Sequence, residues 1–580
     1  MQIPLQRYLT LLGVYLKPQW YKTVLMVVLL LGNIGLDLYR PQITKTFIDT
    51  AGNGDVNNLL HLAILFVVIA IVSQIFSMLS GYLSTVVSWT ATNTLRRDLT
   101  EHILSLDMSY HKEHTPGEMI ERIDGDVGEL ASFFSEFLVN VFSNGLLLIG
   151  VLILFYTISL LVGLSMTIFV IFAFVALTAI RRRSISVWKQ KREMSALFFG
   201  FLEERLRGTE DIRANGATGY TMRTFFQMRR LYWPINLRSA FAVISLYGGS
   251  QILFAIGTAL TLGLGGYLWS TKSITLGTAY LLYSYMNRLN WPIQQIQSQF
   301  QDLQQAEASM KRVEELFNTQ SALQDGPGTP LPAGPLSVDF EGMTFGYLED
   351  EAILHDLTFR IPAGRVLGVL GRTGSGKTTL GRLLFRLYDA QQGTIKLGGV
   401  PVKEATLHEL RQRVGIVTQD VQIFHASVRD NLTFFNPDIP DEKIIQTLSR
   451  IGLSYWYEAL EEGLDTTLGS EGSGLSAGEA QLLAFTRVFL HNPGLIILDE
   501  ASSRLDPATE HLIEQAIDTL FTNRTAIIIA HRLATVQRAD DILILENGRI
   551  LEYGEQAALA SQPDSRFSYL LKTGLEGAYA

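Results

Sequence analysis

The sequence contains no cysteine, and only 18% of its 580 residues are charged. The absence of cysteine excludes disulfides, thiolate catalysis and cysteine-ligated zinc. The low charge is unusual for a soluble protein, because a solvated surface needs more charged side chains. The net charge of −9 also lacks the basic excess that is typical of nucleic-acid-binding proteins. We therefore expect no nucleic acid as partner.

The apolar residues crowd into the first half of the chain. Six stretches are long enough to cross a bilayer as helices, which takes about 20 residues, and they lie near residues 20–45, 58–88, 134–157, 159–180, 243–269 and 274–298. Runs such as Leu146–Tyr156 and Leu160–Ile180 carry no charge, which argues against buried core helices of a soluble protein. Residues 1–317 are therefore predicted to form an all-α transmembrane domain of six helices.

Basic residues gather in two of the segments between these stretches. The first set follows the second span and comprises Arg96, Arg97, Lys112 and Arg122; the other follows the fourth span and comprises Arg181, Arg182, Arg183, Lys189, Lys191 and Arg192. Cytoplasmic loops carry an excess of lysine and arginine. The pattern predicts a multi-pass protein of the cytoplasmic membrane, surrounded by membrane lipids, with both termini and both long loops in the cytoplasm.

A few polar side chains interrupt the apolar stretches. Asp37 and Arg40 are three residues apart on the first span, where they can share one face of the helix. Gln251 and Arg288 lie on the fifth and sixth spans. Such groups are costly within a membrane and often mark a pathway. We interpret these four residues as candidates for a substrate pathway; the alternative is a structural ion pair or a side chain that reaches to the membrane surface.

The second half of the chain reads as an α/β domain. Residues 318–335 are rich in glycine, proline and alanine and are predicted to be a linker, and the domain is predicted to occupy residues 336–580. Within it, Gly371–Thr378 matches the phosphate-binding pattern G-x-x-x-x-G-K-[ST]. The motif follows the apolar run Val366–Leu370 and opens a helical run that is predicted to reach Tyr388. That context predicts a site for ATP and Mg²⁺.

Each residue of this motif has a physical task. Backbone N–H groups of the glycine-rich loop and the helix N-terminus favour phosphate. Lys377 is expected to reach the β- and γ-phosphates, and the hydroxyl of Thr378 is expected to hold Mg²⁺. The predicted nucleotide-binding set from this segment is Gly371, Thr373, Gly374, Ser375, Gly376, Lys377, Thr378 and Thr379.

Two further apolar runs end in groups suited to phosphate chemistry. Leu495–Leu498 is followed by Asp499 and Glu500, and Thr525–Ala530 is followed by His531. Functional groups in such sheets gather at the carboxyl ends of strands. Asp499 is therefore expected to bind Mg²⁺ through water, and Glu500 to activate the water that attacks the γ-phosphate. His531 is expected to contact that phosphate.

Leu475-Ser476-Ala477-Gly478-Glu479, between these two strands and the phosphate-binding loop, resembles the signature motif of ATP-binding cassette ATPases, which usually reads LSGGQ. Tyr347 matches the aromatic A-loop residue that stacks on adenine, and Gln419 matches the Q-loop. Ser503-Arg504-Leu505-Asp506 matches the D-loop. With the apolar spans ahead of these motifs, essentially the whole chain resembles a half-transporter of the ATP-binding cassette (ABC) exporters.

The resemblance implies a dimer in which two cassettes close head to tail around two ATP molecules. Ser476 and Gly478 would then serve the partner's γ-phosphate, and Asp506 would belong to the same composite site. Gln419 would contact Mg²⁺ and take part in catalysis with Glu500 and His531. Short helices near Tyr110–Glu118 and Asp211–Gly216 resemble the coupling helices that transmit closure of the cassettes to the membrane helices.

The expected function is ATP-driven export of a hydrophobic or amphipathic solute, such as a drug-like compound, a lipid or a peptide. The alternatives are an importer of the same fold and an ATP-gated channel or regulatory membrane ATPase. The signature departs from the family pattern, because it reads LSAGE and places a methyl group and a carboxylate where phosphate is expected. This departure slightly favours a heterodimer with a second, unlike half-transporter over a homodimer.

Overall fold

The computed structural model describes residues 13–52, 55–132, 141–348, 351–419, 421–469, 475–499, 507–530 and 536–573. The chain divides into two compact units. The first comprises Met1–Leu104 and Pro116–Thr319, and the second comprises Ser105–Thr115 and Gln320–Ala580. Each unit is described by itself.

The first unit is entirely helical. Its helices are η1 (Lys17–Gln19), α2 (Trp20–Ala51), α3 (Val56–Ser105), α5 (Pro116–Ile120), the π-helical η2 (Glu121–Asp126), α6 (Val127–Ser132), α7 (Phe142–Ile158), α8 (Leu160–Arg207), α9 (Thr209–Ala214), α10 (Thr218–Ser270) and α11 (Leu276–Asn318).

The long helices of this unit continue past the apolar stretches of the sequence. Within the described residues, four helical segments are long and apolar enough to cross a membrane: Gly13–Ala51, Val56–Ser105, Leu160–Arg207 and Thr218–Ser270. The apolar helix α7 is shorter, and residues 133–140 of its predicted span lie outside the described residues. The first unit is thus a helical transmembrane domain, and its count of six spans stays a prediction.

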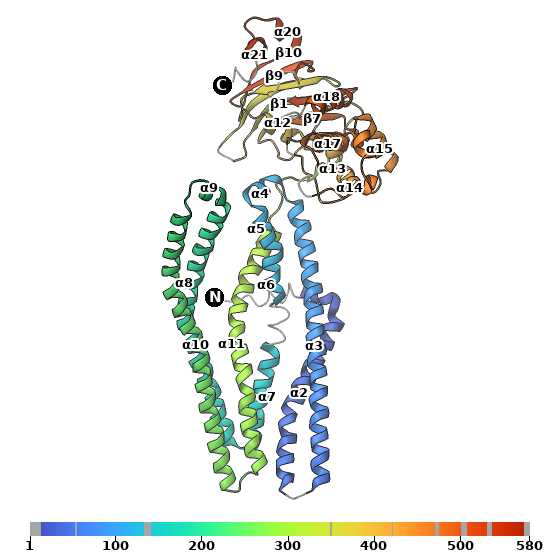
Figure 1. Ribbon diagram of the computed structural model, residues 1–580. Helices are drawn as coiled ribbons and strands as arrows, with labels where there is room; N and C mark the ends of the chain where they lie inside the picture. Colours follow the sequence, from blue (N-terminus) through green and yellow to red (C-terminus); the bar gives the residue numbers. More distant parts are fainter. Residues whose placement is uncertain are drawn as a thin grey trace. The chain divides into compact units, whose positions relative to one another are not determined.

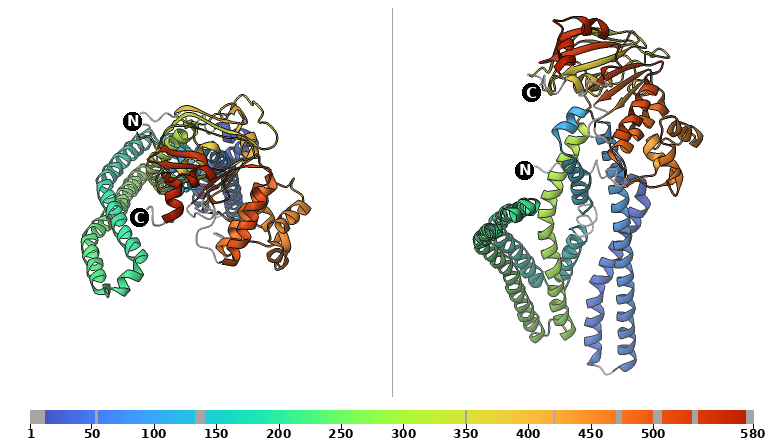
Figure 2. Two further views of the ribbon diagram at one scale, coloured as in Figure 1. Left: turned by 90° about the horizontal axis from the view of Figure 1, so that it is seen from above. Right: turned by 45° about the horizontal axis from the view of Figure 1, so that its top comes forward.

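Neighbouring helices pack closely where small residues permit it. Figure 1 shows α8 and α10 side by side, joined at one end through α9, and Figure 2 shows the same pair from two other directions. On α10, a Cβ at Gly257 would lie 2.2 Å from the end of Met286 and 2.4 Å from the ring of Phe169. The fully buried Tyr285 meets the ring of Phe155 edge-on at a centroid distance of 6.0 Å. A single apolar core therefore joins α7, α8, α10 and α11.

Helix α3 differs from α8 in how much of its surface is covered. In the most apolar stretch of α3, 6% of the residues are buried, compared with 39% in α8. Large apolar side chains such as Leu60, Ile71 and Met78 are exposed along α3. Exposed apolar surface on this scale needs lipid or another protein chain as its surroundings.

The second unit contains two β-sheets. Its strands are β1 (Val338–Phe345), β2 (Leu354–Ile361), β3 (Val366–Gly371), β4 (Gln392–Leu397), β5 (Val400–Pro401), β6 (Val414–Val417), β7 (Leu495–Asp499), β8 (Thr525–Ile529), β9 (Asp541–Glu546) and β10 (Arg549–Glu555). The smaller sheet has the order β2-β1-β4-β5, and the larger has the order β10-β9-β3-β8-β7-β6.

Helices complete this unit. They are α4 (Met108–Glu113), α12 (Lys377–Leu384), α13 (Leu407–Arg413), α14 (Val428–Thr433), α15 (Asp441–Arg450), α16 (Ser454–Glu458), η4 (Gly463–Asp465), α17 (Ala477–His491), α18 (Pro507–Phe521), α20 (Gln556–Ser561) and α21 (Arg566–Thr573).

The larger sheet is parallel from β9 to β6. Strands β3, β7 and β8 are buried along their whole lengths, as near-continuous apolar runs predict for a sheet covered on both faces. Helix α12 packs directly on this sheet, since a Cβ at Gly381 would lie 3.2 Å from Ile497. The prediction of an α/β domain is confirmed.

Helix α12 ends at Leu384, so the predicted extension to Tyr388 is wrong. Arg386 adopts a positive φ of 50°, which a continuing right-handed helix cannot contain. Its buried guanidinium is held by the carboxylate of Asp389 at 3.0 Å and by the carbonyl oxygen of Gln324 at 2.8 Å. These contacts stabilise the turn that ends the helix.

Candidate functional site

The parallel sheet brings the predicted phosphate-binding groups to one edge. Strand β8 lies between β3 and β7, and β6 lies on the other side of β7. The phosphate-binding loop follows β3, Asp499 ends β7, and Gln419 comes two residues after the end of β6. Because the carboxyl ends of parallel strands meet at the same edge, this edge is the candidate site.

Glycines shape the loop between β3 and α12. Gly371, Gly374 and Gly376 have positive φ angles of 154°, 84° and 98°. A Cβ at Gly376 would lie 2.3 Å from a methyl group of Leu354, and one at Gly371 would lie 2.4 Å from the carbonyl oxygen of Leu545. Any side chain at these two positions would strain the backbone and clash with its neighbours.

The loop has the properties of an anion cradle. Ser375 is 4% exposed, and its hydroxyl has no hydrogen-bond partner among the described residues. A Cβ placed on Gly374 would meet nothing within 4 Å, so open space lies on that side of the loop. Helix α12 begins directly after the loop, and its N-terminus favours negative charge. These residues fit the phosphates of ATP.

The Lys377 ammonium is buried beside the loop. Its Nζ donates to the carbonyl oxygen of Gly371 at 2.8 Å and to that of Arg372 at 3.1 Å, and the residue is 6% exposed. The next side chain, Thr378, donates from its hydroxyl to Oδ1 of Asp499 at 3.3 Å. A lysine, a hydroxyl and a carboxylate from two strands are therefore joined, and they are the donor set that a nucleotide with Mg²⁺ requires.

Tyr347 is tied to the same helix. Its hydroxyl lies 3.1 Å from Oγ1 of Thr379 and accepts a hydrogen bond of 3.0 Å from Arg382. The Nζ of Lys112, on α4 of the same unit, lies 3.9 Å from the centre of the Tyr347 ring. Burial raises the pKa of the neighbouring Tyr388 phenol, with Tyr347 as a further cause. The aromatic ring thus lies at the start of the nucleotide helix and already attracts a cation.

The signature segment forms the N-terminus of α17. Ser476 is the N-cap, and its hydroxyl accepts a hydrogen bond from the backbone N–H of Glu479 at 3.2 Å. Oε2 of Glu479 accepts in turn from the backbone N–H of Ser476 at 2.7 Å and from its hydroxyl at 2.9 Å. Gly478 is buried in the first turn. The carboxylate of Glu479 therefore takes up donors that a phosphate at this helix end would use.

Helix α17 is anchored below the signature by Arg487. Its guanidinium donates to the carbonyl oxygen of Asn431 at 2.8 Å and to that of Gln422 at 3.0 Å. It also lies 4.7 Å from the ring centre of Phe434. Burial lowers the pKa of Arg487 to about 10, which leaves it charged at neutral pH. The signature helix is thus connected to the segment that follows Gln419.

Several predicted residues are not joined to this cluster by the structure. Glu500, Asp506 and His531 lie outside the described residues. Thr373 and Gln419 are exposed at the sheet edge. Their roles stay predictions from their places in the sequence.

The transmembrane unit brings three of its four predicted pathway residues together. Oδ1 of Asp37 lies 3.6 Å from Nη1 of Arg40 and 3.4 Å from Nη1 of Arg288. Gln251 is exposed on α10, and no hydrogen bond or ion pair links it to this trio within the described part of the chain. One carboxylate faces two guanidinium groups, so the trio carries a net positive charge.

Two contacts of the site went unnoticed in the sequence. The capping box of Ser476 and Glu479 has a signal, because S-x-x-E before an apolar run is its pattern. The approach of Lys112 to Tyr347 has none, since the two residues belong to distant segments. Lys112 entered the sequence argument only as one of the basic loop residues.

Comparisons with known proteins agree with this geometry. Residues 23–293 match the family model "ABC transporter transmembrane region", and residues 354–503 match "ABC transporter". The ABC transporter ATP-binding protein YknV of Bacillus subtilis is 32% identical over 81% of this chain and 78% of its own length. The ATP-dependent lipid A-core flippase of Alcanivorax borkumensis is 28% identical over 94% of each chain.

A solved structure extends the likeness to the whole fold. It is that of a bacterial Atm1-family ABC exporter with ATP bound, which is 25% identical to this chain. It covers 95% of this chain and 98% of its own, with a TM-score of 0.79. The chain belongs to the ABC transporter family, as an exporter-type polypeptide that joins a transmembrane region to its ATPase domain.

Proposed function

We propose that this chain is one half of a dimeric exporter that uses ATP and Mg²⁺ to move a hydrophobic or amphipathic solute out of the cytoplasm. The observation that carries the proposal is the meeting of Lys377, Thr378 and Asp499 at one sheet edge, in a chain that also has long apolar helices. The lipid A-core flippase among the relatives supports an amphipathic solute.

Within the ATP site, the proposed tasks follow from the side chains. The amide groups of the glycine-rich loop and the ammonium of Lys377 hold phosphate oxygens. Thr378, Gln419 and Asp499 would hold Mg²⁺, which supplies charge neutralisation between the β- and γ-phosphates. Glu500 orients and deprotonates the attacking water, and His531 contacts the γ-phosphate. Ser476, Gly478 and Asp506 act in the composite site with the partner chain.

Short helices suited to coupling occur where the sequence predicts them. Helix α4 belongs to the second unit, and Asp107 at its N-cap accepts a hydrogen bond from the backbone N–H of Ala322 at 2.6 Å. Helix α9 joins α8 to α10. We propose that both transmit closure of the ATPase domains to the membrane helices, so that ATP shifts the population between two packings of the bundle.

Transport in vesicles tests the proposed function. Inside-out membrane vesicles that contain the chain and its native partner should accumulate a radiolabelled amphiphile when ATP is added, because export is directed into such vesicles. Vesicles with Glu500→Gln should not accumulate it. Accumulation in right-side-out vesicles would instead indicate import, and an ATP-gated ion conductance without accumulation would indicate a channel.

The proposed partner is a second, unlike half-transporter. At the N-terminus of α17, Glu479 already accepts from the backbone and hydroxyl of Ser476, so a partner's γ-phosphate would meet a carboxylate there. Like charges at this distance repel. The phosphate-binding loop of the same chain has no such obstacle. We therefore assign this chain a complete ATP loop and a weakened signature, with a homodimer as the alternative.

ATPase measurements distinguish the two assemblies. The chain purified alone should hydrolyse ATP slowly, and turnover should rise at least tenfold when the native partner is co-purified, because the partner supplies an unaltered signature. In a homodimer, Ser476→Ala would slow hydrolysis at both sites. Robust turnover of the chain alone, stimulated by drugs or lipids and lost in Ser476→Ala, would contradict the heterodimer.

A further inference from the structure

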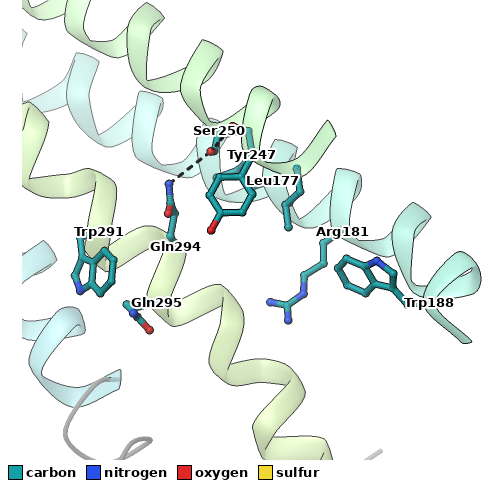
Figure 3. A pocket seen from close by; sticks show the side chains of 9 residues that line it. Leu177, Arg181, Trp188, Tyr247, Ser250, Trp291, Gln294 and Gln295 are labelled. Carbon is teal, nitrogen blue, oxygen red and sulfur yellow. Dashed lines mark hydrogen bonds between the residues drawn. The ribbon is translucent and has the colours of Figure 1, made fainter. Parts of the chain in front are cut away.

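A pocket lies between α8, α10 and α11 of the transmembrane unit. Its volume is about 290 Å³, and it is lined by Leu177, Arg181, Trp188, Leu246, Tyr247, Ser250, Trp291, Gln294 and Gln295. In Figure 3, side chains from the three helices extend toward the space between them. Small-molecule sites usually measure about 300–1,000 Å³, so the pocket has room for a head group and the start of a tail.

The lining groups are mainly hydrogen-bond donors and ring faces. Arg181 supplies a guanidinium, Trp188 and Trp291 supply indole N–H groups, and no acidic side chain is among the described lining residues. Gln294 is oriented by its amide nitrogen, which donates to Asn290 at 2.7 Å and lies 3.5 Å from the hydroxyl of Ser250. Ser250 is itself 4% exposed. A fixed amide and a buried hydroxyl beside a guanidinium favour an anion with several oxygen atoms.

The charge of the surrounding helices points the same way. No aspartate or glutamate occurs between Asp211 and Asp302, a range that contains all of α10 and the part of α11 that lines the pocket. On α8 there is none before Glu193, whereas Arg181 is followed by two more arginines. From α2, the carboxylate of Asp37 already faces Arg40 and Arg288. The field at the pocket is therefore positive, which attracts anions.

The depth of Arg181 suits the head of an amphiphile. The preceding residues, Leu160–Ile180, form an uncharged helical run, which is about the length that crosses the hydrocarbon core. Arg181 is thus the first charge at the membrane boundary, where tryptophan side chains are also favoured. Leu177, one turn earlier on α8, is 1% exposed and continues into the apolar core of the bundle. A head group at Arg181 would leave its tail on the apolar side.

We infer that this pocket selects the anionic head group, a carboxylate or a phosphate, of the amphiphile that the exporter moves. The inference rests on the proposed function and narrows its solute class to anions. Arg181 binds the anion directly, Gln294 and Ser250 orient it, and Trp188 and Trp291 flank the start of the tail.

Binding of charged probes to the wild-type complex in lipid nanodiscs tests this first. The probes are 16-(9-anthroyloxy)palmitate, its primary amine analogue and its uncharged methyl ester, with a fluorescent lysophosphatidate as the phosphate counterpart. Energy transfer from tryptophan reports binding. The two anions should bind at least tenfold more tightly than the amine or the ester, and the tighter anion identifies the head group. Equal affinities, or tighter binding of the amine, would overturn the inference.

Variants then locate the site. Arg181→Gln should weaken binding of the preferred anion by about 10- to 100-fold, the usual effect of losing a hydrogen bond to a charged group. Arg181→Lys should restore part of it. Arg183→Gln is the matched control, because that arginine is exposed on the same helix and does not line the pocket, and its affinity should stay within twofold. An unchanged affinity in Arg181→Gln would overturn the site. If Arg181→Gln does not fold, the comparison of anion, amine and ester on the wild type decides.

Transport of the same probes in inside-out vesicles separates this inference from the proposed function. ATP-dependent accumulation of the amine and not of the anions would leave export standing and overturn the anionic site. Arg181-dependent binding of anions without ATP-dependent movement of any probe would support the site and contradict export.

Discussion

Replacing Lys377 with alanine should weaken ATP binding by about a hundredfold, which corresponds to about 2.7 kcal/mol. In the described structure the ammonium is buried and is held by two carbonyl oxygens of the phosphate-binding loop, so it is close to where the phosphates would lie. Phosphate contacts made by a charged donor contribute about 1.5–3 kcal/mol each. Equilibrium displacement of a fluorescent ATP analogue from the purified complex measures the change.

The matched control for this substitution is Lys396→Ala. Lys396 lies on β4 of the smaller sheet, and its Nζ pairs with Glu341 at 2.7 Å, away from the phosphate-binding loop. It removes the same charge from the same unit and should leave ATP affinity within twofold. If both variants bound ATP as the wild type does, the phosphate assignment of Lys377 would be wrong.

Exchange of Glu500 for glutamine should lower ATP turnover by at least a hundredfold while ATP binding is kept. Glu500 directly follows Asp499 at the carboxyl end of β7, and a general base contributes about 10²- to 10⁴-fold to the rate. The amide has the size of the carboxylate but cannot accept a proton from water. Phosphate release under saturating ATP measures turnover, and occlusion of labelled ATP shows that the closed dimer forms.

Glu546→Gln controls for a carboxylate at the end of another strand. Glu546 is exposed at the carboxyl end of β9, in the same sheet as β7, and is assigned no part in the reaction. Its variant should turn over ATP at the wild-type rate. Normal turnover in Glu500→Gln would remove Glu500 from the role of base, and loss of ATP occlusion would indicate a structural defect instead.

Much of the ATP site could be predicted from the sequence because its parts are local. The positions of Gly371, Gly376 and Lys377 follow from a short motif, and the positive φ angles at the two glycines are what that motif requires. Asp499 was predicted to join them because a buried apolar run ends there, and parallel strands bring their carboxyl ends to one edge. Its hydrogen bond with Thr378 is the contact that this rule predicts.

Other features were outside the reach of sequence patterns. The end of α12 at Leu384 depends on buried contacts of Arg386 with Asp389 and with a carbonyl group far away in the chain. Periodicity does not record such contacts. In the membrane unit, Asp37 and Arg40 share a helix face, but the arrival of Arg288 from α11 depends on how the helices pack.

The sequence by itself determined the membrane-embedded and ATPase parts of this protein and the chemistry of its phosphate-binding loop. Hydrophobic run length and strand-loop-helix order are written in consecutive residues, so they need no knowledge of packing. Only the tertiary structure decided that Lys112 faces Tyr347 and that Arg181, Gln294 and Trp291 surround one pocket. Those residues come from helices far apart in the chain, and only packing of the whole unit brings them within reach of one another.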